Sequence, residues 1–382
     1  DIEEDKYETM GKVFKKPHIP SSIKRTLYSG PNFYVSNPIY KSPRNNYKAN
    51  NDYDNIDLVT LPTNYEYKTL FGTEAETDFL DKAVLGFNSE KSASTNKDYI
   101  SWLSLYRVAF RKMVGPTSER TLIGAIIPPE MSHIDTVHSV ALKNKFDVIQ
   151  LTSLSSSLIL DFYLKTIGST NLYDTRIKAF PMGISKAYQS AMYSRTLLLN
   201  SLTVHYADLW QSCWRPEYAQ EEWSLSDPRL KPFIGLTEEW TWNTPLRNYF
   251  ERRQALVEID VLAAMALGLS LKDLELIYTI QFPVLQQNEN DTWYDAKGNI
   301  VFTCSKGLNG VGCERKEWES IRGNLSEDSM TYEGTEATYI HTINPKKSEM
   351  YGGEQVTYYA PYTKCDRIAD YRRAWAFFEN RF

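Results

Sequence analysis

The sequence has little cysteine and lacks any long apolar run. Four cysteines in 382 residues are too few for a disulfide-stabilised secreted scaffold, so we expect a reducing, cytoplasmic environment. The most apolar stretch, LVEIDVLAAMALGLSL, is interrupted by Glu258 and Asp260, and no signal-peptide pattern is present. No membrane partner is therefore expected. Because the chain begins with Asp1 rather than Met, we expect it to be part of a longer polypeptide or a processed product.

Motifs that carry catalysis are also missing. His133 and His138 stand five residues apart, which is not the spacing of a zinc-binding HExxH helix. Cys304 and Cys313 flank a glycine-rich loop but have no Cys or His partner nearby in the sequence, so we expect no metal site. The segment GLNGVG (307–312) matches neither a dinucleotide fingerprint nor a P-loop, and it is more typical of a flexible hairpin extension.

Acidic residues are absent from one segment. The chain has a formal net charge of -5 at pH 7, yet residues 9–50 contain no Asp or Glu. The basic residues of this segment are Lys12, Lys15, Lys16, Lys24, Arg25, Lys41, Arg44 and Lys48. Such a segment suits a polyanion, because each neutralised phosphate releases condensed counterions. A solvated basic arm without a partner explains the same composition equally well.

The first half of the chain alternates predicted strands and helices. NFYVSNPIY (32–40) and RTLIGAIIPP (120–129) are predicted to be strands. DVIQLTSLSSSLILDFYLKTIG (147–168) is predicted to be a mostly apolar helix that ends at Gly168. DYISWLSLYRVAFRKMV (98–114) is predicted to be a helix because apolar residues recur at three- and four-residue spacing. Those residues are Leu103, Tyr106, Phe110 and Met113.

A long helix is predicted from Ile184 onward. Its apolar residues alternate between four- and three-residue spacing, which indicates a heptad seam that needs a partner helix. The seam comprises Tyr188, Met192, Arg195, Leu199, Leu202, Tyr206, Leu209 and Cys213. The expected antiparallel partner is 245–268, with Pro245 in its first turn and Gly268 at its end. Within it, FERRQALVEID is expected to be a solvated helix face.

The final third is predicted to be mixed. Ser270 and Asp273 resemble a capping pair for another helix. TWYDAKGNIVFT (292–303) predicts a hairpin, ATYIHTI and EQVTYYAPY predict strands, and DRIADYRRAWAFFENRF (366–382) predicts a closing helix.

Several segments, taken in order, resemble one protein family. GPNFYVSNPIYKSPR and YDNIDL, followed by YRVAFRKMVGPTSERTLIGAIIPP, are similar to the C-terminal half of large adenine-specific DNA methyltransferases. These are the type IIG restriction–modification enzymes and the phage-defence methyltransferases resembling PglX. The similarity continues through STNLYDTRIKAFP, RRQALVEIDVLAAMALGLSLKDLELIYTIQFPVL, WYDAKGNIVF and CDRIADYRRAWAFFE. It covers most of the chain from about Gly30 onward.

The resemblance implies a DNA-recognition region without its own catalytic site or cofactor. In that family the cofactor-binding Gly-rich motif and the catalytic Asn-Pro-Pro-Tyr lie in a preceding domain, where the tyrosine ring stacks on a flipped adenine. Here Asn37, Pro38 and Tyr40 fit that tetrapeptide and Ile39 departs from it, so NPIY resembles the family's segment at the entry to the target-recognition domain. The methyltransferase domain, on the same or a companion polypeptide, is expected to use S-adenosylmethionine.

We therefore predict an α+β fold in three parts that binds double-stranded DNA in the cytoplasm. Residues 1–183 form a mixed-sheet recognition lobe, 184–285 long antiparallel helices, and 286–382 a smaller, hairpin-rich part that closes on a helix. The predicted phosphate contacts are Lys41, Arg44, Lys48, Arg107, Arg111 and Lys112, with Arg176 and Lys178 as weaker candidates.

Other polar residues in these segments have simpler roles. Arg120 is expected to form a structural ion pair. Asn45, Asn46 and Asn50 are of a type that reads adenine, but turn formation is more typical of them. No base-reading residue is assigned.

Two other classes of protein remain as alternatives. The chain is a helical docking module of a defence complex if the heptad seam from Tyr188 to Cys213 faces a partner protein. It is a carbohydrate-binding or carbohydrate-active protein if its 9 Trp and 26 Tyr form stacking platforms, although no carboxylate pair is marked out and core packing explains the rings as well.

Overall fold

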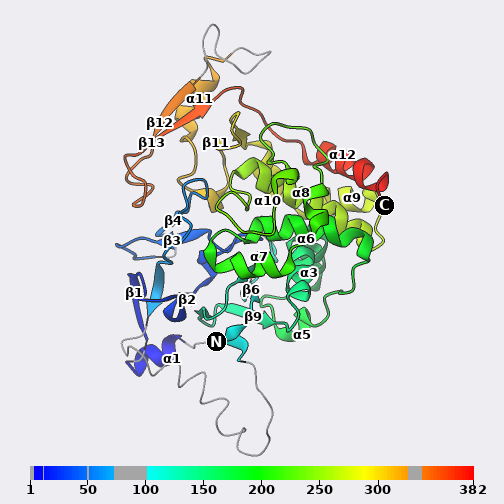
Figure 1. The fold of residues 1–382 in the computed structure, drawn as a ribbon. Coiled ribbons are helices and arrows are strands. Elements are labelled where there is room, and N and C mark those ends of the chain that lie inside the picture. The colour runs from blue at the N-terminus through cyan, green and yellow to red at the C-terminus, as the bar shows by residue number, and fades with distance from the viewer. Residues whose placement is uncertain (1–3, 12, 50, 73–100, 326–337) are drawn as a thin grey trace, which may run out of the picture.

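The computed structural model describes residues 4–11, 13–49, 51–72, 101–325 and 338–382 (Figure 1). Helices and several small sheets make up this part of the chain, which confirms the predicted α+β class. Lys12, Asn50 and the first residues of the predicted 98–114 helix lie outside the described residues. Within the described ranges, no helix combines the length and the apolarity needed to cross a lipid bilayer.

Short strands shape the N-terminal third, after a first helix, α1 (Glu4–Thr9). One sheet has the order β1-β5-β2-β8, another has the order β7-β6-β9, and β3 pairs with β4. The first sheet consists of β1 (Phe14–His18), β5 (Thr69–Gly72), β2 (Leu27–Tyr28) and β8 (Ser132–His133). The second consists of β7 (Gly124–Ile127), β6 (Arg107–Arg111) and β9 (Val137–Ala141). The hairpin is formed by β3 (Lys41–Pro43) and β4 (Tyr53–Asn55).

The helix predicted for 98–114 is wrong, because β6 is the central strand of the antiparallel β7-β6-β9 sheet. Both faces of this strand are covered: Val108 and Phe110 pack with the helices, whereas Ala109 packs on the opposite side. A strand buried on both faces shows little polar alternation, so its apolar residues also fit a helical period. Met113, expected on the buried face of the helix, is 70% exposed.

Most of the helices pack around α8 (Tyr249–Ala266), which contacts α3, α4, α6, α9 and α12. The other helices between residues 145 and 290 are α3 (Lys145–Ser156), α4 (Leu158–Ile167), α5 (Asp174–Ile177), α6 (Lys186–Asn200), α7 (Ala207–Cys213), α9 (Leu271–Gln281) and α10 (Pro283–Asn290). Several local predictions are confirmed. Gly168 and Gly268 follow helix ends with φ of +68° and +75°, and Ser270 and Asp273 form a capping box. The predicted 147–168 helix is divided at Ser157, which caps α4.

The predicted partnership between the 184–214 and 245–268 segments is confirmed for α6 and α8. They run antiparallel, because Arg195 Nε donates to Glu258 Oε2 at 2.5 Å while Arg252 Nη1 donates to the carbonyl of Leu199 at 3.0 Å. The seam is not one continuous helix, however. The chain leaves the helix after Asn200 and becomes helical again with a short 3-10 helix, Val204–Tyr206, that leads into α7, so the heptad pattern spans a break.

The prediction that FERRQALVEID is a solvated face is wrong. Arg253, Glu258 and Asp260 are all less than a tenth exposed. Each of them has an oppositely charged partner elsewhere in the chain: Arg253 pairs with Glu289 and Asp370, Glu258 with Arg195, and Asp260 with Arg367. A buried charge is tolerated when a countercharge and hydrogen bonds replace its water, which explains how a highly charged helix lies at the centre of the protein.

The C-terminal third contains the predicted hairpins and the predicted closing helix. The first hairpin turns at Gly298, whose φ is +84°, and the closing helix begins at the N-cap Asp366. The elements are β10 (Trp293–Tyr294), β11 (Ile300–Phe302), α11 (Arg315–Arg322), β12 (Thr338–Thr342), β13 (Gln355–Tyr359) and α12 (Arg367–Glu379). Figure 1 shows α11, β12 and β13 projecting at one side, while α12 returns to the helices through Tyr371 and Phe378.

Replacing Arg195 tests the role of the buried charges. Arg195→Met leaves the fully buried Glu258 carboxylate without its cation, so we expect the free energy of unfolding to fall by about 3–5 kcal/mol in a urea titration at neutral pH. The control, Lys178→Met, removes an exposed ion pair with Asp174 and should cost less than about 1 kcal/mol. Equal losses in the two variants would contradict this interpretation.

Candidate functional site

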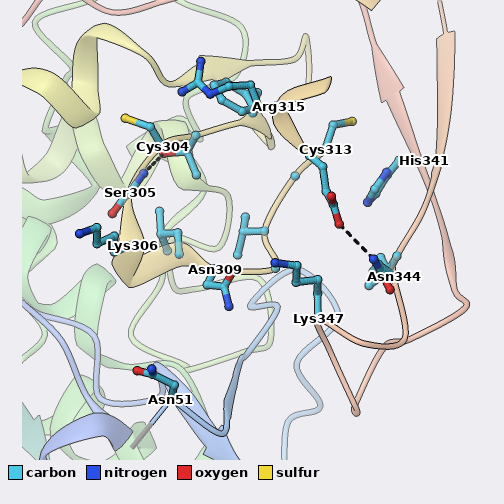
Figure 2. A pocket seen from close by; sticks show the side chains of 18 of the residues that line it. Asn51, Cys304, Ser305, Lys306, Asn309, Cys313, Arg315, His341, Asn344 and Lys347 are labelled. Carbon is cyan, nitrogen blue, oxygen red and sulfur yellow. Dashed lines mark hydrogen bonds between the residues drawn. The ribbon is translucent and has the colours of Figure 1, made fainter. Parts of the chain in front are cut away.

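A cleft of about 640 Å³ lies between the β3–β4 hairpin and the C-terminal segments (Figure 2). One wall comes from residues 41–53, and the facing walls come from 302–315 and 341–347. Within the described residues, a single carboxylate, Glu314, lines this cleft. The lysines and arginine that line it are Lys41, Lys306, Lys347 and Arg315. Segments distant in the sequence thus produce a local excess of positive charge in a chain that is acidic overall.

Lys41 is the half-buried cation of the cleft. Its Nζ lies 5.0 Å from the centroid of the Tyr40 ring, and among the described residues no carboxylate forms an ion pair with it. Burial, aided by the nearby positive charge of Arg111, lowers the pKa of Lys41 to about 8. An ammonium that loses hydration without gaining a countercharge is costly, and a bound anion would offset that cost.

The two sides of the cleft are joined by hydrogen bonds. Tyr40 Oη donates to the carbonyl of Gly307, and Asn55 Nδ2 donates to the carbonyl of Asn309 at 2.8 Å. Asp54 then connects the hairpin to the 344–353 turn, because its carboxylate accepts from the amides of residues 349 and 350 at 2.9 and 2.8 Å. The cleft is therefore built into the packing of the N- and C-terminal segments.

The glycine-rich segment 307–312 forms part of the cleft wall rather than a projecting loop. At Gly312, with a φ of +74°, a Cβ would lie 2.6 Å from the carbonyl oxygen of Val301. At Gly307 a Cβ would lie 2.8 Å from Tyr40 Oη. Close approach of neighbouring groups therefore requires these glycines.

The structure separates the basic residues predicted near the N-terminal hairpin. Lys41 lines the cleft, whereas Arg44 is not among its lining residues and forms an ion pair between its Nε and Asp54 Oδ1 at 2.8 Å. The Arg44 Nη2 also donates to the carbonyl of Lys347. Lys48 is exposed on the following loop.

Arg107 and Arg111 lie on the same face of strand β6, where Arg107 is fully buried and Arg111 is partly buried. Arg107 is 0% exposed, donates to the carbonyl of Met131, and lies 4.7 Å from the centroid of the Trp102 ring. Burial lowers its pKa to about 10. Arg111 donates to the carbonyls of Gly30 at 2.7 Å and Phe33 at 2.5 Å. Their main partners are therefore protein carbonyls and aromatic rings.

A second hollow, of about 360 Å³, lies beside the cleft. Lys15, Arg111, Tyr47 and Tyr53 are among its lining residues, and Tyr53 also lines the cleft itself. The Lys15 Nζ lies 5.5 Å from the centroid of the Tyr47 ring. The two hollows thus place cations and aromatic rings next to each other along the N-terminal basic segment.

The remaining phosphate candidates lie elsewhere. Lys112 forms an ion pair with Asp135 at 2.7 Å. Arg176 and Lys178 are exposed at α5, and Figure 1 shows α5 well away from β3 and β4. The structure therefore does not assemble the predicted cations into one surface.

The structural roles expected for other polar residues fit the contacts. Arg120 Nε pairs with Asp161 Oδ2 at 2.6 Å, which confirms the expected ion pair. Asn45 and Asn46 lie in an exposed turn, where the amide of Asn45 donates to Glu349 Oε1 at 2.9 Å.

The tetrapeptide NPIY folds as a tight turn. Asn37 Oδ1 accepts a hydrogen bond from the amide of Ile39 at 3.1 Å, and the Ile39 side chain is 1% exposed within the core. The Tyr40 ring stacks on Tyr34, with 5.0 Å between the ring centroids. The departure at Ile39 therefore has a packing role here.

Sequence reasoning missed Lys306, Arg315 and Lys347. They lie far from Lys41 along the chain, and nothing in their local pattern indicates that they face it. One signal was available: Lys306 directly precedes the glycine-rich segment, and glycines often mark a close approach of two parts of a protein.

Comparison of the chain with protein-family models, with characterised proteins and with solved structures finds no match.

The depressed pKa of Lys41 predicts how stability depends on pH. In the unfolded chain the pKa of Lys41 is the usual lysine value of about 10.4, whereas in the folded chain it is about 8. Between these two pH values the unfolded chain binds more protons than the folded chain, so Lys41 makes the free energy of unfolding rise with pH. We expect Lys41→Met to raise the free energy of unfolding at pH 7 and to remove the contribution of Lys41 to the increase of stability with pH. The exposed-site control, Lys306→Met, should retain that increase. A destabilised Lys41→Met protein at pH 7, measured by urea titration, would contradict the prediction.

Proposed function

We propose that the cleft binds the phosphate backbone of double-stranded DNA and that the chain is the sequence-recognition region of an adenine-N6 DNA methyltransferase. The host enzyme would belong to a restriction–modification or phage-defence system. One observation carries the proposal: half-buried Lys41 faces a cleft that it shares with Lys306, Arg315 and Lys347, while one carboxylate lines the same cleft within the described residues. Duplex DNA is the specific polyanion suggested by the resemblance of the sequence segments.

The cleft offers the groups that phosphate contacts need. Lysine and arginine contribute charge, and displacement of condensed counterions from DNA then favours binding. Amides of Asn51 and Asn309 line the same space and are neutral donors for phosphate or sugar oxygens, whereas Asn344 Nδ2 donates to Glu314 Oε1 at 3.0 Å. Arg315 forms an ion pair with Asp291 at 2.8 Å, which partly neutralises its charge. Lys306 and Lys347 therefore supply the positive charges that are freer to contact phosphate. These contacts set position and affinity, whereas base readout requires further residues that we do not assign.

Methyl transfer belongs to another domain in this proposal. The Asn37 side-chain oxygen is engaged within its own turn and Ile39 is packed in the core, which supports a structural role for NPIY. The methyltransferase domain of the same or a companion polypeptide would bind S-adenosylmethionine and the target adenine. The present chain would hold the flanking duplex.

The alternative of docking through the heptad seam has less support. Leu199, Leu202 and Leu209 are all 0% exposed because the chain's own segments cover them. A partner protein therefore has no access to these three leucines in the folded chain. Aromatic platforms for carbohydrate are not favoured either, since rings such as Trp210 and Trp318 are buried in the core.

Charge reversal in the cleft tests the proposed interface. Lys306→Glu combined with Lys347→Glu should weaken binding to duplex DNA at least about ten-fold, and the salt dependence of log K should become shallower by about 0.9 for each phosphate that the protein no longer neutralises. Fluorescence anisotropy across a salt series measures both quantities. The matched control, Arg176→Glu with Lys178→Glu, makes the same charge change at α5 and should bind as the parent does. If the α5 variant loses affinity and the cleft variant does not, the cleft is not the interface.

The pH dependence of binding tests Lys41 separately. As the pH rises through about 8, free Lys41 loses its proton, so affinity for duplex DNA should fall. Lys41→Arg keeps its charge in this range and should retain affinity above pH 8. A parallel decline of the parent and of Lys41→Arg, in the same anisotropy assay at constant ionic strength, would show that Lys41 does not contribute.

A further inference from the structure

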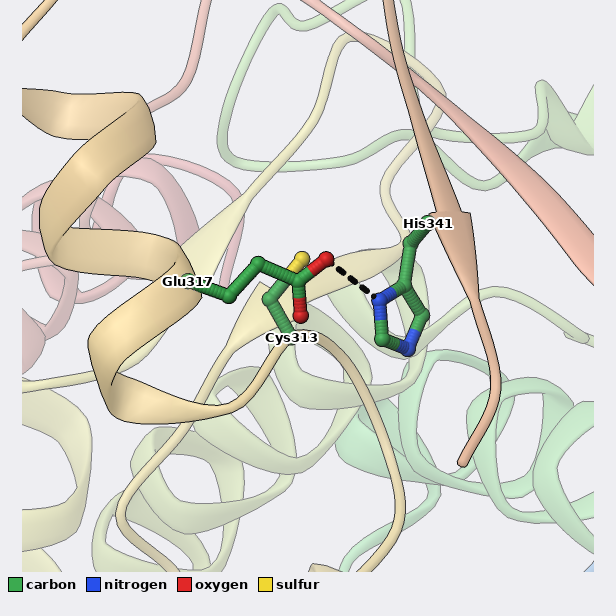
Figure 3. A group of neighbouring side chains, drawn as sticks. All are labelled: Cys313, Glu317 and His341. Carbon is green, nitrogen blue, oxygen red and sulfur yellow. Dashed lines mark hydrogen bonds and ion pairs between the residues drawn. The ribbon is translucent and has the colours of Figure 1, made fainter. Parts of the chain in front are cut away.

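Three side chains of different chemistry lie close together (Figure 3): Cys313, Glu317 and His341, of which Cys313 and His341 line the cleft. One thiol sulfur, one carboxylate oxygen and one ring nitrogen all lie within 4.8 Å of one another. The His341 Nδ1 is 2.8 Å from Glu317 Oε1. Cys313 and His341 are each 5% exposed, so the cluster is largely shielded from bulk water.

Independent elements hold these residues in place. The amide of Cys313 donates to the carbonyl of Val301 at 2.7 Å, at the end of the glycine-rich segment pressed against β11. Glu317 lies in the first turn of α11, where its carboxylate accepts from the amide of Glu314 at 3.3 Å. His341 is on β12, paired with Val356 of β13. Loop, helix and strand therefore converge on one point.

We propose that Cys313, Glu317 and His341 bind one Zn²⁺ ion, with the fourth coordination position facing the cleft. Tetrahedral zinc with sulfur, nitrogen and oxygen ligands requires separations of roughly 3.3–3.8 Å between ligand atoms, and the three ligand atoms here lie within 4.8 Å of one another. A thiolate with an imidazole selects zinc over the hard cations Mg²⁺ and Ca²⁺. Cys313 and His341 also line the cleft, so water or an anionic oxygen is suited to the open position.

A neighbouring tyrosine is placed as an outer-shell partner of the proposed ligand Glu317. Tyr339 Oη donates to Glu317 Oε1 at 2.9 Å, which orients the carboxylate. Zinc bound here would connect α11 to β12 and so stabilise the wall that carries Arg315 and Lys347. Zinc binding here would not require DNA, because these three side chains supply the ligands.

Cobalt substitution tests the site in the full chain. After treatment with a chelator, we expect one equivalent of Co²⁺ to produce a thiolate-to-cobalt charge-transfer band and the visible bands of a tetrahedral site, both removed by Zn²⁺. Cys313→Ser should lose the charge-transfer band. The matched control Cys304→Ser, which alters another cysteine of the same cleft, should retain it.

A second measurement separates metal binding from folding. Zn²⁺ should raise the Tm of the parent and of Cys304→Ser but leave the Tm of Cys313→Ser unchanged. Should Cys313→Ser fail to fold, Glu317→Gln supplies the test, with zinc affinity expected to fall by more than the roughly 10–100-fold that loss of an outer-shell partner costs. Absence of a charge-transfer band in the parent with Co²⁺ in excess, or retention of the band by Cys313→Ser, would overturn the proposal and leave a metal-free Glu317–His341 hydrogen bond.

Discussion

The placement of the C-terminal segments depends on the pairing of charges buried around α8. Glu289 of α10 accepts hydrogen bonds from Arg253 of α8 and Arg367 of α12, and Arg367 in turn reaches Asp260. Burial opposes ionisation of Glu289, but the two guanidinium groups outweigh it and lower its pKa to about 2. Any docking of α10 or α12 that left one of these charges unmatched would be severely penalised, so the network selects one arrangement.

That arrangement also creates the cleft. α10 leads into the β10–β11 hairpin and the glycine-rich segment, and α12 holds the chain end on the helices. The segment between them is thereby set against β3 and β4, where Tyr40 and Asn55 donate to its carbonyls. The same hydrogen bonds bring Lys306 near Lys41, which is the charge arrangement on which our functional proposal rests.

Sequence reasoning was most successful where a signal is local. A capping box needs residues three apart, and a hairpin turn needs one glycine, so the Ser270–Asp273 cap and the Gly298 turn were predicted from the residues concerned. It failed at β6 and along α8, where the environment is supplied by remote segments. The spacing of Phe110 and Met113 is compatible with a helix, but β7 and β9 pair with this segment and make it a strand.

The amino-acid sequence by itself determined the α+β class, the ends of several helices and the acid-free basic segment near the N-terminus, since composition and short-range spacing contain that information. Tertiary structure decided which cations are accessible: it buried Arg107 under Trp102 and Met131, and it left Lys41 facing a cleft. It also brought Cys313 close to His341. These two residues are far apart along the chain, so the sequence shows no recognisable spacing of metal ligands. Burial and countercharge are properties of neighbours in space, and a linear pattern does not specify those neighbours.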